Sequence, residues 1–159
     1  MSANVLLGRA WILLCLALFL HVTDEALTGF LAVYNPTVIA LRERIPWLPL
    51  PVFRFEIWLA GLLAASAVLL GLSRFVYRGA KWMRPAAYLF AALMIANALG
   101  HVAGTLAGRT VASVPVRRPM PGFYSSPLLL AASLYLLARL RAPAPRPATA
   151  VSSGSGEAG

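Results

Sequence analysis

Apolar residues gather in four long runs, separated by short segments rich in arginine, proline and glycine. The runs cover residues 6–34, 55–72, 85–107 and 121–140. Each approaches the roughly 20 helical residues needed to cross a hydrocarbon layer about 30 Å thick. Because lipid offers no hydrogen-bond partners, such runs fold as helices whose backbone groups pair internally. The pattern predicts an all-helical polytopic membrane protein, a bundle of four transmembrane helices in one domain over residues 1–141.

Two segments fall outside these runs. Residues 35–54 contain four prolines and Trp47, an aromatic residue suited to the membrane interface. We expect this segment to lie on the membrane surface, with a short amphipathic helix over residues 37–44. The tail, residues 142–159, consists mainly of proline, alanine, serine and glycine. Such a composition offers little to bury and predicts disorder.

The last apolar run has a short helical part. Ser126 followed by Pro127 is typical of an N-cap with proline at the first helical position. That start leaves about fourteen helical residues to Leu140, or roughly 21 Å, which is too short to cross. We therefore expect residues 119–126 to dip into the membrane as irregular backbone, which is tolerated only where protein covers it or it lines a wet cavity.

The first run has an alternative interpretation as a cleaved signal peptide. Residues 6–20 resemble an apolar signal region, with Arg9 near its start. No clear cleavage site follows, and apolar residues resume after His21. A retained first helix fits the sequence better.

Composition and charge agree with a membrane protein. Hydrophobic residues make up 60% of the chain and charged residues 12%, against roughly 25% charge in soluble domains. The net charge of +9 comes from basic residues at the ends of the runs, where they act as topology signals and not as a nucleic-acid surface. The basic group over residues 74–84 favours an inner-membrane protein with both termini in the cytoplasm. The single cysteine, Cys15, excludes an intramolecular disulfide.

Ionisable and polar residues interrupt the apolar runs at two places. The first run contains His21, Asp24 and Glu25, and the third contains Asn97 and His101. His21 and Glu25 lie about 40° apart on one helix face, as do Asn97 and His101. If four helices cross, both groups lie at matching depth in the leaflet away from the termini. Such residues are expensive in lipid and indicate a functional site.

Small residues in the third run indicate how its helix packs. They recur every four residues at Ala92, Ala96, Gly100, Gly104 and Gly108. This small-xxx-small spacing predicts close approach of a neighbouring helix. The stripe lies one residue away from Asn97 and His101, so that packing would turn these two side chains toward the bundle interior.

The polar residues resemble the motifs of bacterial HXXEE-type membrane proteins, which carry His-x-x-Glu-Glu, Asn-x-x-x-His and Tyr-x-Pro-Gly in this order. Here His21 is followed by Asp24 and Glu25, so aspartate replaces the first glutamate. The second motif, from Asn97 to His101, is intact. Position 119 carries proline where the family has tyrosine, and Tyr124 is the nearest phenol that follows. The resemblance implies a membrane-embedded enzyme.

These residues predict a metal site. His21, Glu25 and His101 supply two imidazoles and a carboxylate, the ligand set of many catalytic zinc centres; iron and manganese are alternatives. Asp24, Glu25, Asn97 and Tyr124 are the candidate catalytic residues, with Asp24, Asn97 or Glu56 as base or supporting partner. The expected substrate is lipid-like or a small amphipathic molecule. The expected partners are membrane lipids and no nucleic acid, and a homo-oligomer stays open.

Three other interpretations use the same residues. Without metal, the cluster can transfer protons to or from a substrate. As a relay for protons or ions it would belong to a small transporter. As a structural cluster it would only hydrogen-bond the first helix to the third. Two adjacent carboxylates argue against that last interpretation, because a single Asn–His pair would join two helices. Glu56 has a plain alternative as the partner of Arg54.

Overall fold

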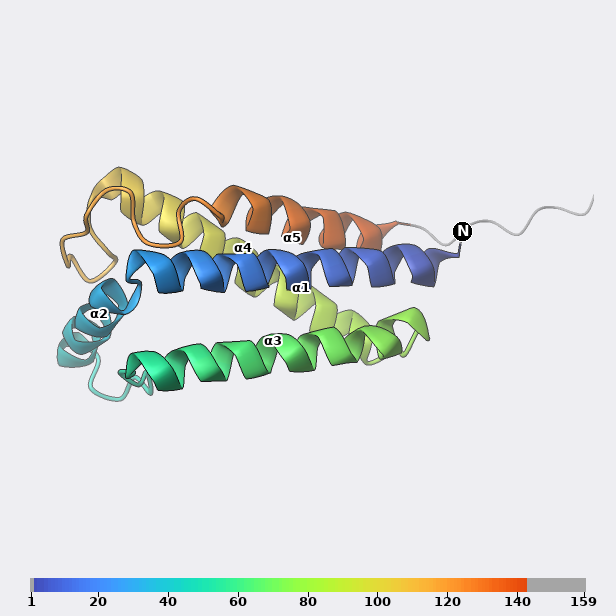
Figure 1. Cartoon of the computed structure of the whole chain (residues 1–159), viewed down its shortest axis with the longest axis horizontal. Helices are drawn as coiled ribbons and strands as arrows, with labels where there is room; N and C mark the ends of the chain where they lie inside the picture. The colour runs from blue at the N-terminus through green and yellow to red at the C-terminus, as the bar shows by residue number, and fades with distance from the viewer. Residues whose placement is uncertain (1, 143–159) are drawn as a thin grey trace, which may run out of the picture.

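The computed structural model describes residues 2–142, which form five helices (Figure 1). Three are long: α1 (Ala3–Thr28), α3 (Phe55–Tyr77) and α4 (Met83–Ala107). Two are shorter: α2 (Leu31–Arg44) and α5 (Ser126–Arg141). The predicted all-helical class is therefore confirmed for this part of the chain. Ala142 is the one residue of the predicted disordered tail that the structure describes. The rest of that prediction, for residues 143–159, lies outside the described residues.

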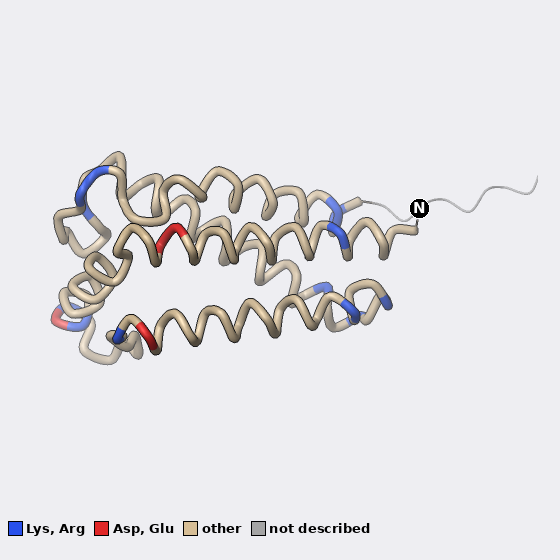
Figure 2. The backbone as a smooth tube through the Cα atoms, in the orientation of Figure 1, with Lys and Arg blue, Asp and Glu red and all other residues tan. Residues whose placement is uncertain are grey.

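Three helices, α1, α3 and α4, are long and apolar enough to cross a membrane. The fourth predicted crossing is not confirmed, because α5 has 16 residues, or about 24 Å of helix against a hydrocarbon layer of about 30 Å. Basic residues gather at the two ends of the molecule, and the length between them is nearly free of charge (Figure 2). This separation is typical of a protein that spans a membrane.

The core forms around α1, which packs against α3 on one side and α5 on the other, while α4 packs mainly against α5 (Figure 1). Trp11, Leu14 and Cys15 of α1 are fully or almost fully buried there. The indole of Trp11 donates a hydrogen bond to the Leu69 carbonyl at 2.9 Å. This contact joins α1 to α3 inside the apolar region, where an unpaired indole N–H would be costly.

The first apolar run is not one helix, contrary to the prediction of a span over residues 6–34. Helix α1 ends at Thr28, and Gly29 adopts the left-handed conformation (φ 79°) with its N–H bonded to the Glu25 carbonyl. Glycine at this position ends helices because it has no Cβ to clash. The chain then turns into α2, which begins at Leu31, six residues before the predicted surface helix. Hydropathy alone does not reveal this turn.

Two other boundaries differ from the predictions. Helix α3 continues to Tyr77, past the predicted end at residue 72, because the long side chain of Arg74 can reach toward the interface while its backbone stays helical. At the start of α5, Ser125 and not Ser126 stands at the N-cap position, and it makes no side-chain cap. The Ser126 hydroxyl donates instead to the Gly122 carbonyl at 2.7 Å.

The segment before α5 is irregular, as predicted, and folds back onto α1 and α4. Gly122 N–H donates to Thr28 Oγ1 at 3.3 Å, and Met120 N–H donates to Thr105 Oγ1 at 3.0 Å. Side-chain hydroxyls thus satisfy backbone groups that have no helical partner. These bonds hold the segment beside the polar residues of both helices.

Candidate metal centre

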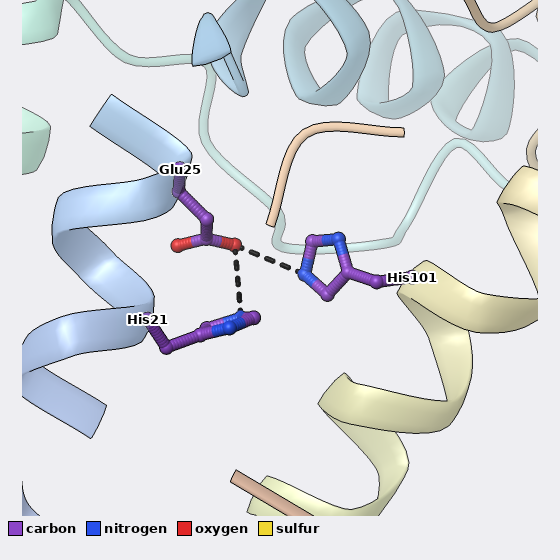
Figure 3. Close-up of side chains that lie close together, drawn as sticks. All are labelled: His21, Glu25 and His101. Atoms are coloured by element: carbon purple, nitrogen blue, oxygen red, sulfur yellow. Dashed lines mark ion pairs between the residues drawn. The ribbon is translucent and has the colours of Figure 1, made fainter. Parts of the chain in front are cut away.

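The cluster combines His21 and Glu25 from α1 with His101 from α4 (Figure 3). All three are at most 4% exposed. His21 and Glu25 are four residues apart and therefore share one helix face, and the Glu25 carboxylate points between the two imidazole rings (Figure 3). The expected convergence of the two polar groups is confirmed by these positions.

The spacing of the ligand atoms suits a small cation. Glu25 Oε1 lies 3.1 Å from His101 Nε2 and 3.6 Å from His21 Nε2. Tetrahedral coordination with bonds of 2.0–2.1 Å separates neighbouring ligand atoms by about 3.3 Å. One ligand atom from each residue lies within 4.8 Å of the others. The three residues can therefore hold a metal ion after small side-chain movements.

The second nitrogen of His21 takes part in a hydrogen-bonded chain to Asp24. His21 Nδ1 lies 2.8 Å from Ser125 Oγ, which lies 2.8 Å from Asp24 Oδ2 and, at a longer 3.2 Å, from the Gly122 carbonyl. The Ser125 N–H also donates to Asp24 Oδ2, at 2.9 Å. An ionised carboxylate can only accept hydrogen bonds, and the Ser125 hydroxyl has one proton to donate. Because Ser125 uses that proton in its hydrogen bond to Asp24, its oxygen accepts from His21, so the proton of His21 is on Nδ1.

This chain places the lone pair of His21 on Nε2, the nitrogen that faces the cluster. Asn97 Nδ2 lies 3.1 Å from that nitrogen and donates to it. Both neighbours therefore favour the same tautomer. Histidine ligands commonly donate their other N–H to a carboxylate or to a group bonded to one, which orients the ring and raises its basicity. Asp24 thus acts on the cluster through Ser125.

Gly122 covers the cluster on the side of the loop. Its φ of 82° lies in the left-handed region, and a Cβ there would lie 2.8 Å from His101 Cε1 and 3.1 Å from Glu25 Cγ. Only glycine allows the backbone to approach so closely. The Phe30 ring lies against His101 with its centroid 5.7 Å away. Backbone and aromatic ring together keep the carboxylate and the imidazole out of contact with lipid.

His101 Nδ1 is buried and has no hydrogen-bond partner in the described part of the chain. An unpaired buried polar atom costs about 1–3 kcal/mol and calls for an explanation. A cluster whose only task was to join two helices would be expected to pair this nitrogen. A metal-bound histidine would also usually donate its second N–H to a partner, so the unpaired atom does not separate a structural role from a metal site.

A pocket of about 400 Å³ opens beside the cluster, between α2 and α4. Asn97 and His101 line it, next to Phe30 and Tyr34. Burial raises the pKa of the Tyr34 phenol, whose hydroxyl donates to the Pro51 carbonyl at 3.1 Å. The volume lies within the range of about 300–1,000 Å³ that is usual for small-molecule sites.

Three residues of the predicted small-residue stripe of α4, Ala96, Gly100 and Gly104, line this pocket, contrary to the prediction that the stripe packs against a helix. Nothing lies within 4 Å of a Cβ built at Gly100, and at Gly104 a Cβ would collide with Met120 Sδ. Ala96 and Gly100 both line the pocket. The predicted stripe therefore leaves room for a ligand and for the Met120 side chain.

Two predicted site residues lie outside the cluster. The Tyr124 side chain is 70% exposed, so it is not positioned as the missing phenol of the third motif. Glu56 is 74% exposed and lies 3.9 Å from Arg54, its alternative partner. Ser125 and Gly122 entered the predictions only as members of the irregular segment over residues 119–126, Gly122 also as the glycine of the third motif. A serine pair beside a Pro-Gly dipeptide does not reveal either contact in the sequence.

Comparison of the chain with known protein families, curated proteins and solved structures finds no match.

Proposed function

We propose that this chain is a membrane-embedded metalloenzyme in which His21, Glu25 and His101 hold a divalent cation. The observation that carries the proposal is the convergence of three buried ligand atoms within 4.8 Å of one another, at separations close to those of a tetrahedral site. The resemblance to HXXEE-type proteins belongs to the same proposal, because their first two motifs contribute these residues.

Zinc is the metal that this ligand set favours. Two imidazoles and one carboxylate occur in catalytic zinc centres that keep a fourth position open for water, while iron and manganese accept similar ligands. Such an ion lowers the pKa of bound water to about 7 and polarises a carbonyl or phosphoryl oxygen. Hydrolysis of a lipid-like or small amphipathic substrate is the reaction class that follows.

The protein side chains divide the remaining tasks. The hydrogen bonds from Asp24 through Ser125 to His21 keep the Nε2 lone pair toward the centre. A metal ion at His21 Nε2 would replace the hydrogen bond that Asn97 donates to this nitrogen. Asn97 also lines the pocket beside His101, so its released amide can donate to a substrate oxygen on which negative charge develops. Gly122 and Phe30 lie against His101 and shield the buried groups from lipid, which strengthens these electrostatic interactions.

Acid–base catalysis without metal is the second candidate, and one observation favours it. Asp24, Ser125 and His21 form a continuous hydrogen-bonded chain, Asn97 donates to the other nitrogen of His21, and Glu25 contacts both imidazoles. Such a chain can hold and move a proton as well as orient a ligand. The same chain is the basis of the transporter alternative.

Metal analysis decides between these candidates. The protein is purified without a histidine tag, and zinc, iron and manganese are measured in the parent, in Glu25→Gln and in His101→Ala. Glu56→Gln is the matched control, because Glu56 is an exposed glutamate outside the cluster. We expect about one metal ion per chain in the parent and the control, and a loss of at least about tenfold in affinity in the two cluster variants.

Thermal stability in detergent, measured on the same samples, completes the test. Variants that lose metal and stay folded support the metalloenzyme. Stable variants of a parent that never binds metal support proton transfer, and turnover compared with ion flux in liposomes then separates an enzyme from a transporter. A parent without metal whose variants unfold would leave only a structural cluster.

A further inference from the structure

The pocket beside the cluster continues along α4 as an apolar groove. Its α4 wall runs from Ala96 to Ala107, eleven steps of helix or about 16 Å. Along that wall the small residues are Ala96, Gly100, Ala103, Gly104 and Ala107. Phe30, Val33 and Tyr34 form the opposite wall, at the start of α2. An elongated space with such walls suits an extended hydrocarbon chain.

The two ends of the groove differ in charge. Asn97 and His101 lie near one end, while Arg109 and Thr110 line the other, just after α4. That second end belongs to the end of the molecule where the α4–α5 connection lies (Figure 1). Within residues 2–142, no ion pair involves Arg109, and no acidic residue lines the groove. The electrostatics therefore favour an anionic group beside Arg109.

We propose that this groove binds a single-chain anionic amphiphile, the substrate class of the site. The acid group pairs with Arg109, and the hydrocarbon chain lies along the small residues of α4 and passes His101. In a substrate, the ester or amide to be hydrolysed lies within the chain, about 12 Å from the acid group, where the chain passes His101. The proposal that the amphiphile binds here rests on the shape and charge of the groove alone. The proposal that it is a substrate rests on the proposed metalloenzyme function. Small side chains at Gly100 and Ala103 leave the space that the chain fills.

Photolabelling in nanodiscs of zwitterionic lipid tests this proposal. The probe is a long-chain carboxylic acid with a diazirine in its chain, and mass spectrometry locates the labelled peptides. The comparison probes are the alcohol of equal chain length and a diacyl phospholipid that carries the same photoreactive chain. We expect the acid to label residues 30–37 and 96–107 more strongly than either comparison probe does.

Occlusion of the groove gives the decisive variants. Gly100→Leu places a bulky side chain in the groove, and its Cβ meets nothing within 4 Å. Gly71→Leu on α3 is the matched control, because a Cβ there also meets nothing within 4 Å. We expect Gly100→Leu to reduce labelling by the acid at least about tenfold and Gly71→Leu to leave it unchanged. Ala103→Leu provides a second occlusion if Gly100→Leu does not fold.

Substitution of Arg109 tests the charge. Arg109→Gln should weaken labelling by the acid about two- to fivefold, as expected for a partly exposed ion pair, and leave the alcohol unchanged. Equal labelling by acid and alcohol, with no effect of Arg109→Gln, would refute the anionic group. Stronger labelling by the phospholipid would refute the single chain.

Two further outcomes separate this proposal from the proposed function. Equal labelling of folded Gly100→Leu and Gly71→Leu proteins would show that the chain does not bind in the groove, whatever the metal content. A parent protein without metal whose groove is still labelled would refute the metalloenzyme and keep the lipid site. Gly100→Leu protein that keeps its metal and loses labelling supports both.

Discussion

Glu25 is the residue on which the cluster depends, because a carboxylate buried in the apolar part of a bundle is stable only with close partners. The His101 imidazole lies 3.1 Å from its Oε1 atom and can donate to it, whereas His21 Nε2, 3.6 Å away, presents a lone pair that calls for a cation between the two atoms. The hydrogen bonds that His21 donates to Ser125 and accepts from Asn97 then determine which of its nitrogens carries the proton. These outer residues thus determine whether His21 Nε2 offers a proton to a hydrogen-bond acceptor or a lone pair to a metal ion.

Ser125→Ala tests this influence of the outer residues. The substitution removes the acceptor of His21 Nδ1–H, while Asp24 keeps the bond from the backbone N–H of residue 125. We expect metal affinity to fall about 10- to 100-fold, with a loss of unfolding free energy of only about 1 kcal/mol. Titration of the metal-free protein with zinc, alongside thermal unfolding, measures both effects.

Ser126→Ala is the matched control for this prediction, because its hydroxyl donates to the Gly122 carbonyl and not to the cluster. It should keep the parental zinc affinity at a similar cost in stability. Ser125→Thr retains a hydroxyl and should restore most of the affinity. Equal affinities for Ser125→Ala and Ser126→Ala would show that Ser125 does not orient His21.

The sequence could predict the centre of the cluster but not its surroundings. His21 and Glu25, like Asn97 and His101, are four residues apart, and helix geometry alone puts each pair on one face. Counting residues along the first and third apolar runs also predicted that the two pairs lie at the same depth in the membrane. Ser125 and Gly122 belong to irregular backbone whose position depends on hydrogen bonds to Thr28 and Asp24, and no periodicity encodes such contacts.

At the scale of elements, the turn after α1 positions the α2 wall of the groove against α4. Gly29 ends α1 one turn after Glu25, and α2 then starts with the Phe30 ring against His101. A first run that continued as one helix to residue 34 would carry Phe30 and Tyr34 away from α4. Hydropathy could not reveal this turn, because the apolar residues continue through it.

Gly29→Ala tests the importance of the turn. A Cβ at Gly29 meets nothing within 4 Å, but the φ of +79° is unfavourable for alanine, at a cost of about 1–2 kcal/mol. Gly71→Ala is the control, since Gly71 lies within α3 with open surroundings and alanine there should stabilise the helix by up to about 1 kcal/mol. Thermal unfolding in detergent should therefore move in opposite directions for the two variants. A fall of equal size in both would show that the turn does not depend on its left-handed conformation.

At the scale of the whole molecule, the short helix α5 and the irregular segment before it act together to complete the bundle around the cluster. Helix α5 ends at the same end of the molecule as the amino terminus (Figure 1), where Arg84 donates to the Leu140 carbonyl at 2.8 Å. Its other end begins at Ser126, and Gly122 of the preceding segment lies directly against His101 and Glu25.

The same arrangement predicts the topology: residues 2 and 142 face the cytoplasm, and the connection between α4 and α5 faces outward. The basic residues over 74–84 favour this orientation. Single cysteines introduced by Ser2→Cys, Val111→Cys and Ala142→Cys can be probed in intact cells with a membrane-impermeant maleimide. The natural Cys15 is buried and should stay unlabelled. Labelling of the parent protein, whose single cysteine is Cys15, is the control for this expectation.

Val111 is 86% exposed, so Val111→Cys should react in intact cells, whereas Ser2→Cys and Ala142→Cys should react only after lysis. The reverse pattern would invert the orientation and move the centre to the cytoplasmic leaflet. Reaction of Ala142→Cys together with Val111→Cys would show that the chain crosses three times and that α5 does not complete a fourth crossing. In that case residues 119–125 would lie at the membrane surface, and the cluster would be covered by interfacial loop instead of backbone held within the bilayer.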